Sequence, residues 1–296
     1  MLGRITSQQL LYGSQRNIAA AKSQLAKLQQ QASSGRAIST PSDDPTGTVA
    51  ALQVRAEQRA NTQYGTNIDD GLAWASTVDS SLTSSENLLR QAIDLTVQAA
   101  SSGTLTPGSR EALATQLDGV RADLLGTANT KYLGRSVFAG NSDAPSAFDG
   151  TYSFSGAPGS TVQRRISGTE TVVVSADGAA AYGTGSSSVF ATIDAVTTAL
   201  RGGDDTAVRA GLDTLRGNLS TMSAEHAVVG GRYARLQQAK TTNGNTATSL
   251  ETQRSGLEDA DTAQVLLDLK TQELSYQTAL AVTAQTIQPT LMSFLR

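Results

Sequence analysis

The chain contains a single histidine, His226, which is the side chain best suited to proton transfer near neutral pH. A histidine that acts as a general base needs a nucleophile and a partner that orients its ring. His226 instead stands between Met222 and Val229, within a seven-residue apolar repeat that would place it against a neighbouring helix. We therefore expect a structural histidine. One histidine without any cysteine cannot assemble a zinc site.

Four acidic pairs could bind a cation or act as an acid and a base, namely Asp43-Asp44, Asp69-Asp70, Asp204-Asp205 and Asp259/Asp261. Three of them stand where a helix should begin, and carboxylates there cap free amide groups. Asp69-Asp70 lies inside an expected helix and should face solvent. None follows the spacing of a calcium loop. Capping therefore explains these pairs better than catalysis does.

The remaining candidates for chemistry have structural interpretations too. Gly156, Gly159 and Gly168 fit turns, because they match neither the phosphate loop nor the dinucleotide fingerprint. Trp74 and Tyr64 occupy helical positions that favour packing. The middle of the chain offers an enzyme few charged groups, among them Asp149, Glu170, Asp177, Arg164 and Arg165, and no histidine. We therefore predict no catalytic residue, no metal ligand and no cofactor.

Composition excludes further classes of function. The chain has 296 residues and a net charge of −3, without the basic block that nucleic-acid binding requires. Cysteine is absent, so no disulfide framework can form. The N-terminus has no apolar run typical of a cleaved signal, and no window approaches the ~18 apolar residues of a membrane helix. Taken alone, this predicts a cytoplasmic protein, unless a dedicated export apparatus recognises a different targeting signal.

Both ends of the chain carry apolar residues at seven-residue spacing. The N-terminal row is Leu11, Ile18, Leu25 and Ala32, and the C-terminal row is Leu266, Leu280, Ile287 and Phe294, interrupted by Glu273. Such spacing places the apolar side chains in one stripe along a helix, and the stripe must be buried against a partner. With no catalytic set present, the two stripes favour a protein that assembles.

Helices are expected at about 5–34, 45–101, 107–131, 187–201 and 204–257, and a last one follows the acidic segment 258–261 and runs to about 293. Gly35 fits a left-handed cap after the first, while Asp44 and Pro45 fit the N-cap and first position of the second. The fifth carries the longest repeat: Val208, Leu215, Met222, Val229, Leu236, Asn243, Leu250 and Leu257. Gly and Ser separate short β-branched runs at 137–186, which predicts strands.

The predicted fold is mainly α with a small β insert, a folded-back rod of long antiparallel helices with coiled-coil ends. Residues 1–40 and 258–296 would form an inner assembly domain from the two terminal helices. Residues 41–136 and 187–257 would form a long-helix rod. Residues 137–186 would form a small β-rich domain.

Two segments carry a family resemblance. Residues 33–52, SSGRAISTPSDDPTGTVAAL, and residues 257–296, which end QPTLMSFLR, resemble the N- and C-terminal signatures of the flagellin superfamily. Within it, TPSDDP at 40–45, NIDDGLAW at 67–74 and ANTKYLGRSVFAG at 128–140 resemble the hook–filament junction branch more than filament flagellin. The resemblance is weakest across about 141–200.

The resemblance implies an extracellular structural protein at the hook–filament junction. It implies that the chain is exported by the flagellar type III apparatus without a cleaved signal. The implied partners are a hook-side junction protein, flagellin, copies of the chain in a ring, and a cytoplasmic chaperone at the C-terminal helix. Together with the stripes, it suggests these assembly contacts: Leu11, Ile18, Leu25, Leu28, Leu266, Tyr276, Leu280, Ile287 and Phe294.

Two alternatives of other kinds stay open at this point. The chain could be a small filament flagellin, because the terminal signatures are common to the superfamily. It could also be a signalling coiled coil like those of chemoreceptors, which are likewise rich in alanine and heptads. That class normally has a membrane span or a basic anchor, and we find neither in the sequence.

Overall fold

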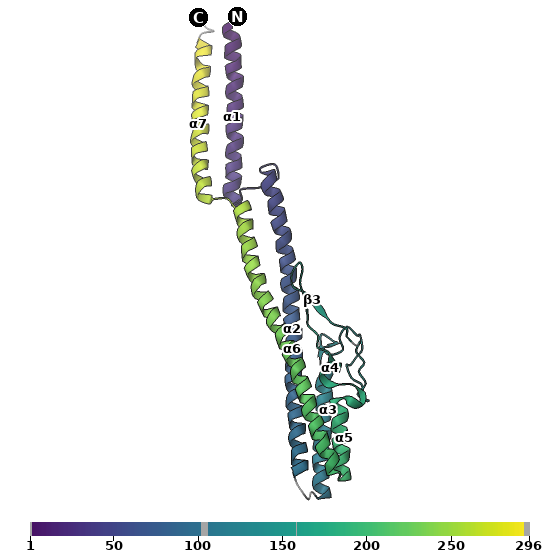
Figure 1. Cartoon of the computed structure of the whole chain (residues 1–296). Helices are drawn as coiled ribbons and strands as arrows, with labels where there is room; N and C mark the ends of the chain where they lie inside the picture. Colours follow the sequence, from purple (N-terminus) through teal and green to yellow (C-terminus); the bar gives the residue numbers. More distant parts are fainter. Residues whose placement is uncertain (1, 102–105, 158, 293–296) are drawn as a thin grey trace. The chain divides into compact units, whose positions relative to one another are not determined.

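The structure is a computed structural model that describes residues 2–101, 106–157 and 159–292, with side chains at 9, 12–101, 106–157 and 159–284. It is mainly helical, as the sequence predicts (Figure 1). The long helices are α1 (Leu2–Ser34), α2 (Pro45–Ser101), α3 (Pro107–Ala128), α5 (Val189–Gly202), α6 (Asp205–Glu258) and α7 (Thr262–Met292). Two compact units can be distinguished, one formed by residues 1–60 with 247–296 and the other by 61–246.

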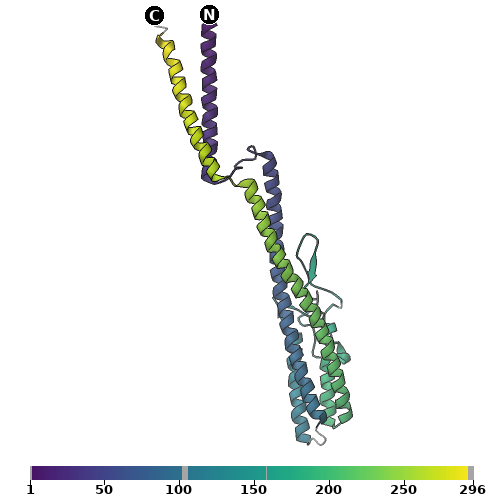
Figure 2. The same ribbon diagram turned by 60° about the vertical axis from the view of Figure 1, so that its left-hand side comes forward.

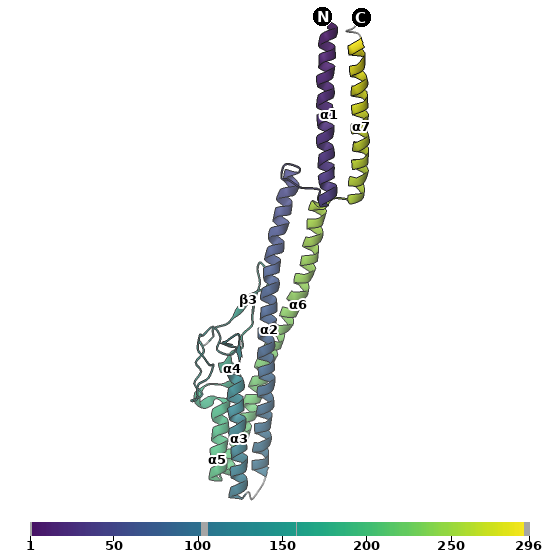
Figure 3. The same ribbon diagram turned by 180° about the vertical axis from the view of Figure 1, so that it is seen from behind.

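The first unit pairs the two terminal helices. The purple helix α1 and the yellow helix α7 lie side by side with the chain ends together, so they run antiparallel (Figures 1 and 3). Leu28 and Val265 are buried in this pair, with 8% and 9% of their surface exposed. The amide of Gln272 on α7 donates to the carbonyl of Ala21 on α1 at 3.1 Å. The two terminal helices thus bury part of their apolar surface within one chain.

Two connectors join these helices to α2 and α6. Gly35 ends α1 in the left-handed conformation with φ +67°, as expected. The N–H of Ala37 donates to the carbonyl of Glu258 at 2.8 Å, and the N–H of Ala260 donates to the carbonyl of Gly35 at 2.9 Å. These two hydrogen bonds hold the ends of the connectors together although they lie more than two hundred residues apart in sequence.

Helix starts follow the capping chemistry predicted from the acidic pairs. Asp44 accepts from the N–H of Gly47 at 2.9 Å before α2. Asp204 accepts from Ala207 before α6, and Asp261 accepts from Ala263 before α7. Gly47 is required here, because a Cβ at this position would lie 2.3 Å from the Asp44 carboxylate.

The second unit gathers α2, α3, α5 and α6 around an apolar core (Figure 2). The fully buried side chains from these four helices include Leu82, Leu89, Leu117, Leu124, Ile193, Leu200, Leu215 and Met222. Each of them has another member of this set seven residues away on the same helix, which explains why helices of this length hold together with few aromatic residues.

The segment between α3 and α5 is less regular than the sequence pattern suggests. Antiparallel pairs are formed by β1 (Lys131–Tyr132) with β2 (Arg135–Ser136) and by β3 (Gln163–Arg165) with β4 (Thr171–Val173). Short helical turns, α4 (Gly178–Tyr182) and η1 (Gly185–Ser187), occupy part of the region expected to be β-rich. Buried aromatic rings supply the packing instead: Phe138, Phe148, Tyr182 and Phe190 contact one another at 5.3–5.8 Å between centroids.

The expectation that Asp69-Asp70 faces solvent is wrong for Asp70. Its carboxylate pairs with Arg164 of β3 at 2.5 Å and lies 3.4 Å from the Tyr132 hydroxyl. The same guanidinium lies 5.7 Å from the ring of Trp74, which is buried as predicted. Asp69 is exposed and pairs with Lys240. The difference arises because the hairpin returns over α2, a tertiary contact that helical periodicity does not reveal.

Candidate assembly surface

Exposed apolar side chains are concentrated in the first unit. Among the described side chains, eight of the ten large exposed apolar residues lie there: Tyr12, Val49, Leu52, Leu266, Leu267, Leu274, Leu280 and Val282. The other two, Leu133 and Val228, lie in the second unit. A gathering of exposed apolar side chains on one part of a protein indicates a candidate interaction site. The first unit is therefore the candidate assembly surface.

Helix α7 presents apolar residues on two faces. Val265 and the half-buried Tyr276 turn toward α1. Leu267 and Leu274, seven residues apart, form a second row and are 65% and 66% exposed. In the sequence this second row is shorter than the row through Leu266 and Leu280, so it was not predicted. The seven-residue spacing of Leu267 and Leu274 is the feature that could have identified it.

Some of the predicted contact residues are buried in the structure and others are exposed. Ile18, Leu25, Leu28 and Tyr276 are wholly or half buried in the described chain. Leu266 and Leu280 are 53% and 42% exposed, which leaves them free to contact another molecule. The side chains of Leu11 and Ile287, and all of Phe294, lie outside the described residues.

A groove runs between α1 and α7 and carries no charge. It encloses about 530 Å³ and is lined by Ser14, Asn17, Ile18, Leu274, Ser275, Thr278, Ala279, Val282 and Thr283. Small hydroxyl and methyl groups form its floor, while Leu274 and Val282 stand exposed at its wall. Such a groove can accept the apolar face of another helix.

The connectors beside this surface are held by charge. Hydrogen bonds from the Thr40 backbone and the Ser39 side chain, with Lys27 at 3.1 Å, keep the pKa of Asp43 well below its usual range. Glu258 is 6% exposed at its side chain and pairs with Arg55 at 2.6 Å. The family-like segment at 40–45 thus has a physical role, since Asp43 fixes the turn and Asp44 caps α2.

The histidine of the second unit has two acidic partners. His226 lies 3.0 Å from both Asp79 and Glu86, one at each ring nitrogen. Among the described residues, no cluster of three or more His, Cys, Asp and Glu side chains could hold a metal ion. In the same part of the chain, no helix combines the length and the apolarity that crossing a membrane requires.

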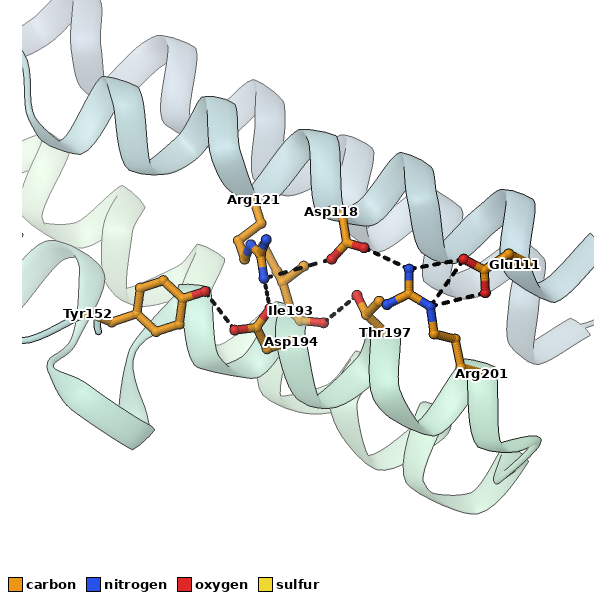
Figure 4. A network of polar contacts seen from close by, with 8 residues as sticks. All are labelled: Glu111, Asp118, Arg121, Tyr152, Ile193, Asp194, Thr197 and Arg201. Atoms are coloured by element: carbon orange, nitrogen blue, oxygen red, sulfur yellow. Dashed lines mark hydrogen bonds and ion pairs between the residues drawn. The ribbon is translucent and has the colours of Figure 1, made fainter. Parts of the chain in front are cut away.

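Figure 4 shows a charged network that joins α3 to α5. Arg201 of α5 contacts Glu111 and Asp118 of α3, and Arg121 of α3 contacts Asp194 of α5. The Tyr152 hydroxyl donates to Asp194 at 2.6 Å and ties the intervening segment to the pair. Every acid here faces a base, which identifies the network as a structural one.

Comparison with known proteins agrees with this geometry. Residues 5–143 match the family described as bacterial flagellin N-terminal helical region, and residues 212–295 match the bacterial flagellin C-terminal helical region. Flagellar hook-associated protein 3 of Salmonella typhimurium is 30% identical over 178 residues. That match covers 60% of this chain and 56% of the relative, so the chain spans just over half the length of that protein.

Two solved structures share the fold. A structure titled as a flagellar hook-associated protein from Vibrio parahaemolyticus gives a TM-score of 0.68 at 20% identity, covering 73% of this chain and all of that one. The flagellar junction protein of Legionella pneumophila gives 0.60 at 12% identity, covering 71% and 100%. At these identities, the likeness establishes the arrangement of helices.

Proposed function

Because this chain belongs to the bacterial flagellin family, we propose that it is a junction protein of the flagellum, which joins the hook to the filament and templates flagellin assembly. Like the flagellar proteins it matches, it is a structural protein and not an enzyme. The observation that carries the proposal is the exposed apolar surface of the first unit. It lies on α1 and α2, which fall in the N-terminal family match, and on α7, which falls in the C-terminal match.

The mechanism is one of templated packing. Leu266 and Leu280 on α7 lose their water when they contact a neighbouring molecule, and each fully buried leucine contributes roughly 1.5–3 kcal/mol. Copies of the chain would join head to tail, because heterologous contacts that do not close leave an open helical lattice on which flagellin adds. A hook-side junction protein would hold the other end.

Export is the second part of the proposal. We propose an extracellular location reached through the flagellar type III apparatus without a cleaved signal. Before assembly, the exposed leucines of α7 would promote aggregation, so a cytoplasmic chaperone should cover this helix. The charge-free groove beside Leu274 supports such helix-in-groove binding.

The alternative is a small filament flagellin, which the shared terminal matches also support. Deleting the gene separates the two. Loss of a junction protein leaves intact hooks, while flagellin monomers accumulate in the medium. Loss of a sole filament flagellin leaves hooks without flagellin in the medium, and this result would contradict the junction proposal. Expression of the intact gene should restore filaments in the first case.

A further inference from the structure

The seven-residue rows of α2 and α6 are each interrupted by one asparagine. The row on α2 is Val54, Asn61, Ile68, Ala75, Leu82 and Leu89, and the row on α6 includes Leu236, Asn243 and Leu250. The apolar residues named here are buried, with at most 8% exposed, whereas the two asparagines are half-buried. Each row thus contains one polar residue among buried apolar ones.

The two asparagines meet each other. The side-chain amide of Asn243 donates to the backbone carbonyl of Asn61 at 2.8 Å and to its side-chain oxygen at 2.7 Å. The side-chain amide of Asn61 donates back to the carbonyl of Asn243 at 3.1 Å. Each side-chain amide therefore donates to the backbone carbonyl of the other asparagine, and the two side chains also bond to each other.

The neighbouring helix leaves room for this contact. Gly65 lies one turn after Asn61, and a Cβ there would stand 3.0 Å from the side-chain oxygen of Asn243. Glycine inside a helix lowers its stability relative to alanine. Its presence at this point fits a requirement for the close approach of the Asn243 amide.

We propose that Asn61 and Asn243 determine the register in which α2 pairs with α6. Both rows repeat every seven residues, so a slip by one heptad would still bury apolar side chains. In a slipped pairing Asn61 would oppose Leu236 or Leu250, and Asn243 would oppose Val54 or Ile68. The amides would then lack their partners, which is costly in a seam, and a buried asparagine is known to select register in this way.

The register matters because other contacts depend on it. In the observed pairing, Gln58 meets Glu251 at 3.0 Å, and Arg55 meets Glu258 at the end of α6. The same pairing brings the carbonyl of Glu258 to the N–H of Ala37. A slip would separate these partners. The proposal concerns the folded chain itself and holds whether or not the junction assignment is correct.

The test uses the absence of cysteine from the chain. A Q58C/E251C pair reports the native register, and a Q58C/G244C pair reports a slip of one heptad. Both are introduced into the full chain and into an N61L/N243L background, refolded from denaturant and oxidised. With both asparagines in place, only the Q58C/E251C pair should crosslink. In the N61L/N243L background both pairs should crosslink, and the yield of the Q58C/E251C crosslink should fall.

Exclusive native crosslinking in the leucine background would overturn the proposal. If that background fails to unfold cooperatively, N61A/N243A takes its place, since it removes the hydrogen bonds without adding apolar attraction. Thermal midpoints supply a second readout. Each single variant should melt below the parent and the double variant above either single, whereas additive effects would contradict the coupling. Asn245→Leu, at an exposed position on α6, is the matched control and should leave the crosslinks unchanged.

Discussion

Arg55, near the start of α2, lies 2.6 Å from the carboxylate of Glu258, the last residue of α6. Arg254 approaches the same carboxylate at 3.4 Å. The carbonyl of Glu258 accepts from the N–H of Ala37, so one residue joins the charged cluster to the connector after α1. The connectors that lead to the assembly surface therefore depend on a nearly buried acid.

Replacing Arg55 by alanine should loosen the connectors. Glu258 would keep only its longer contact with Arg254, and removing a partner from a buried charged group costs about 1–3 kcal/mol. We expect faster hydrogen exchange at the amides of Ala37 and Ala260. Arg59→Ala, at an exposed position on the same helix, is the control and should leave both amides protected. Equal protection in the Arg55 variant would refute this role.

Gly47→Ala should weaken the start of α2. The new methyl group would lie 2.3 Å from the Asp44 carboxylate that caps the helix, and loss of an N-cap costs about 0.5–2 kcal/mol. Gly217→Ala on α6 is the matched control because nothing lies within 4 Å of its Cβ. It should stabilise the helix by up to about 1 kcal/mol. Denaturant titration measures both, and the two variants should shift in opposite directions.

Aspartate on the outer face of α7 should separate assembly from folding. The double substitution L266D/L280D places charge at exposed positions, so the monomer should keep its thermal midpoint while filament attachment is lost. Leu28→Asp is the contrasting variant, because it puts a charge at a side chain only 8% exposed and should lower the midpoint. Normal filaments on cells carrying L266D/L280D would argue against these residues as contacts.

Stability should fall as the pH rises above neutrality. Partial burial opposes charge on His226, but hydrogen bonds to Asp79 and Glu86 outweigh it and raise its pKa above the ordinary 6.5. A raised pKa in the folded state gives stability that is complete below about pH 6.5 and is lost as the pH rises through the folded value. Burial likewise opposes charge on Glu86, but hydrogen bonds from His226 and Arg90 outweigh it and lower the pKa of Glu86. The stability that Glu86 contributes is therefore lost only at acidic pH.

Thermal melting at about pH 6 and about pH 8.5 measures this effect. The parent should have the lower midpoint at the higher pH. His226→Gln cannot titrate, so its midpoint should change less between the two conditions. An equal fall in both proteins would show that another group is responsible.

Much of the helical architecture follows from the sequence. The heptad rows, together with Gly35, Asp44 and Pro45, predict helices that agree closely with α1 and α2, because caps and periodicity are local properties. The helix through Gly230-Gly231 is also continuous, as the seven-residue repeat from Val208 to Leu257 indicates. Family signatures at both ends predict the relatives that the comparisons identify.

Tertiary contacts were harder to foresee. The pairing of Asp70 with Arg164 depends on where a hairpin returns, and the partners of His226 depend on the alignment of α2 with α6. The stripe of α7 predicts an apolar helix but not which leucines α1 leaves exposed. The exposure of Leu267 and Leu274 depends on how α1 packs against α7, which the sequence pattern does not give.

The most direct test of the account is to label this protein with a specific antibody on isolated flagella and view them by electron microscopy. We predict label confined to the hook end of each filament. Label distributed along the filament would contradict the junction assignment and favour the filament flagellin.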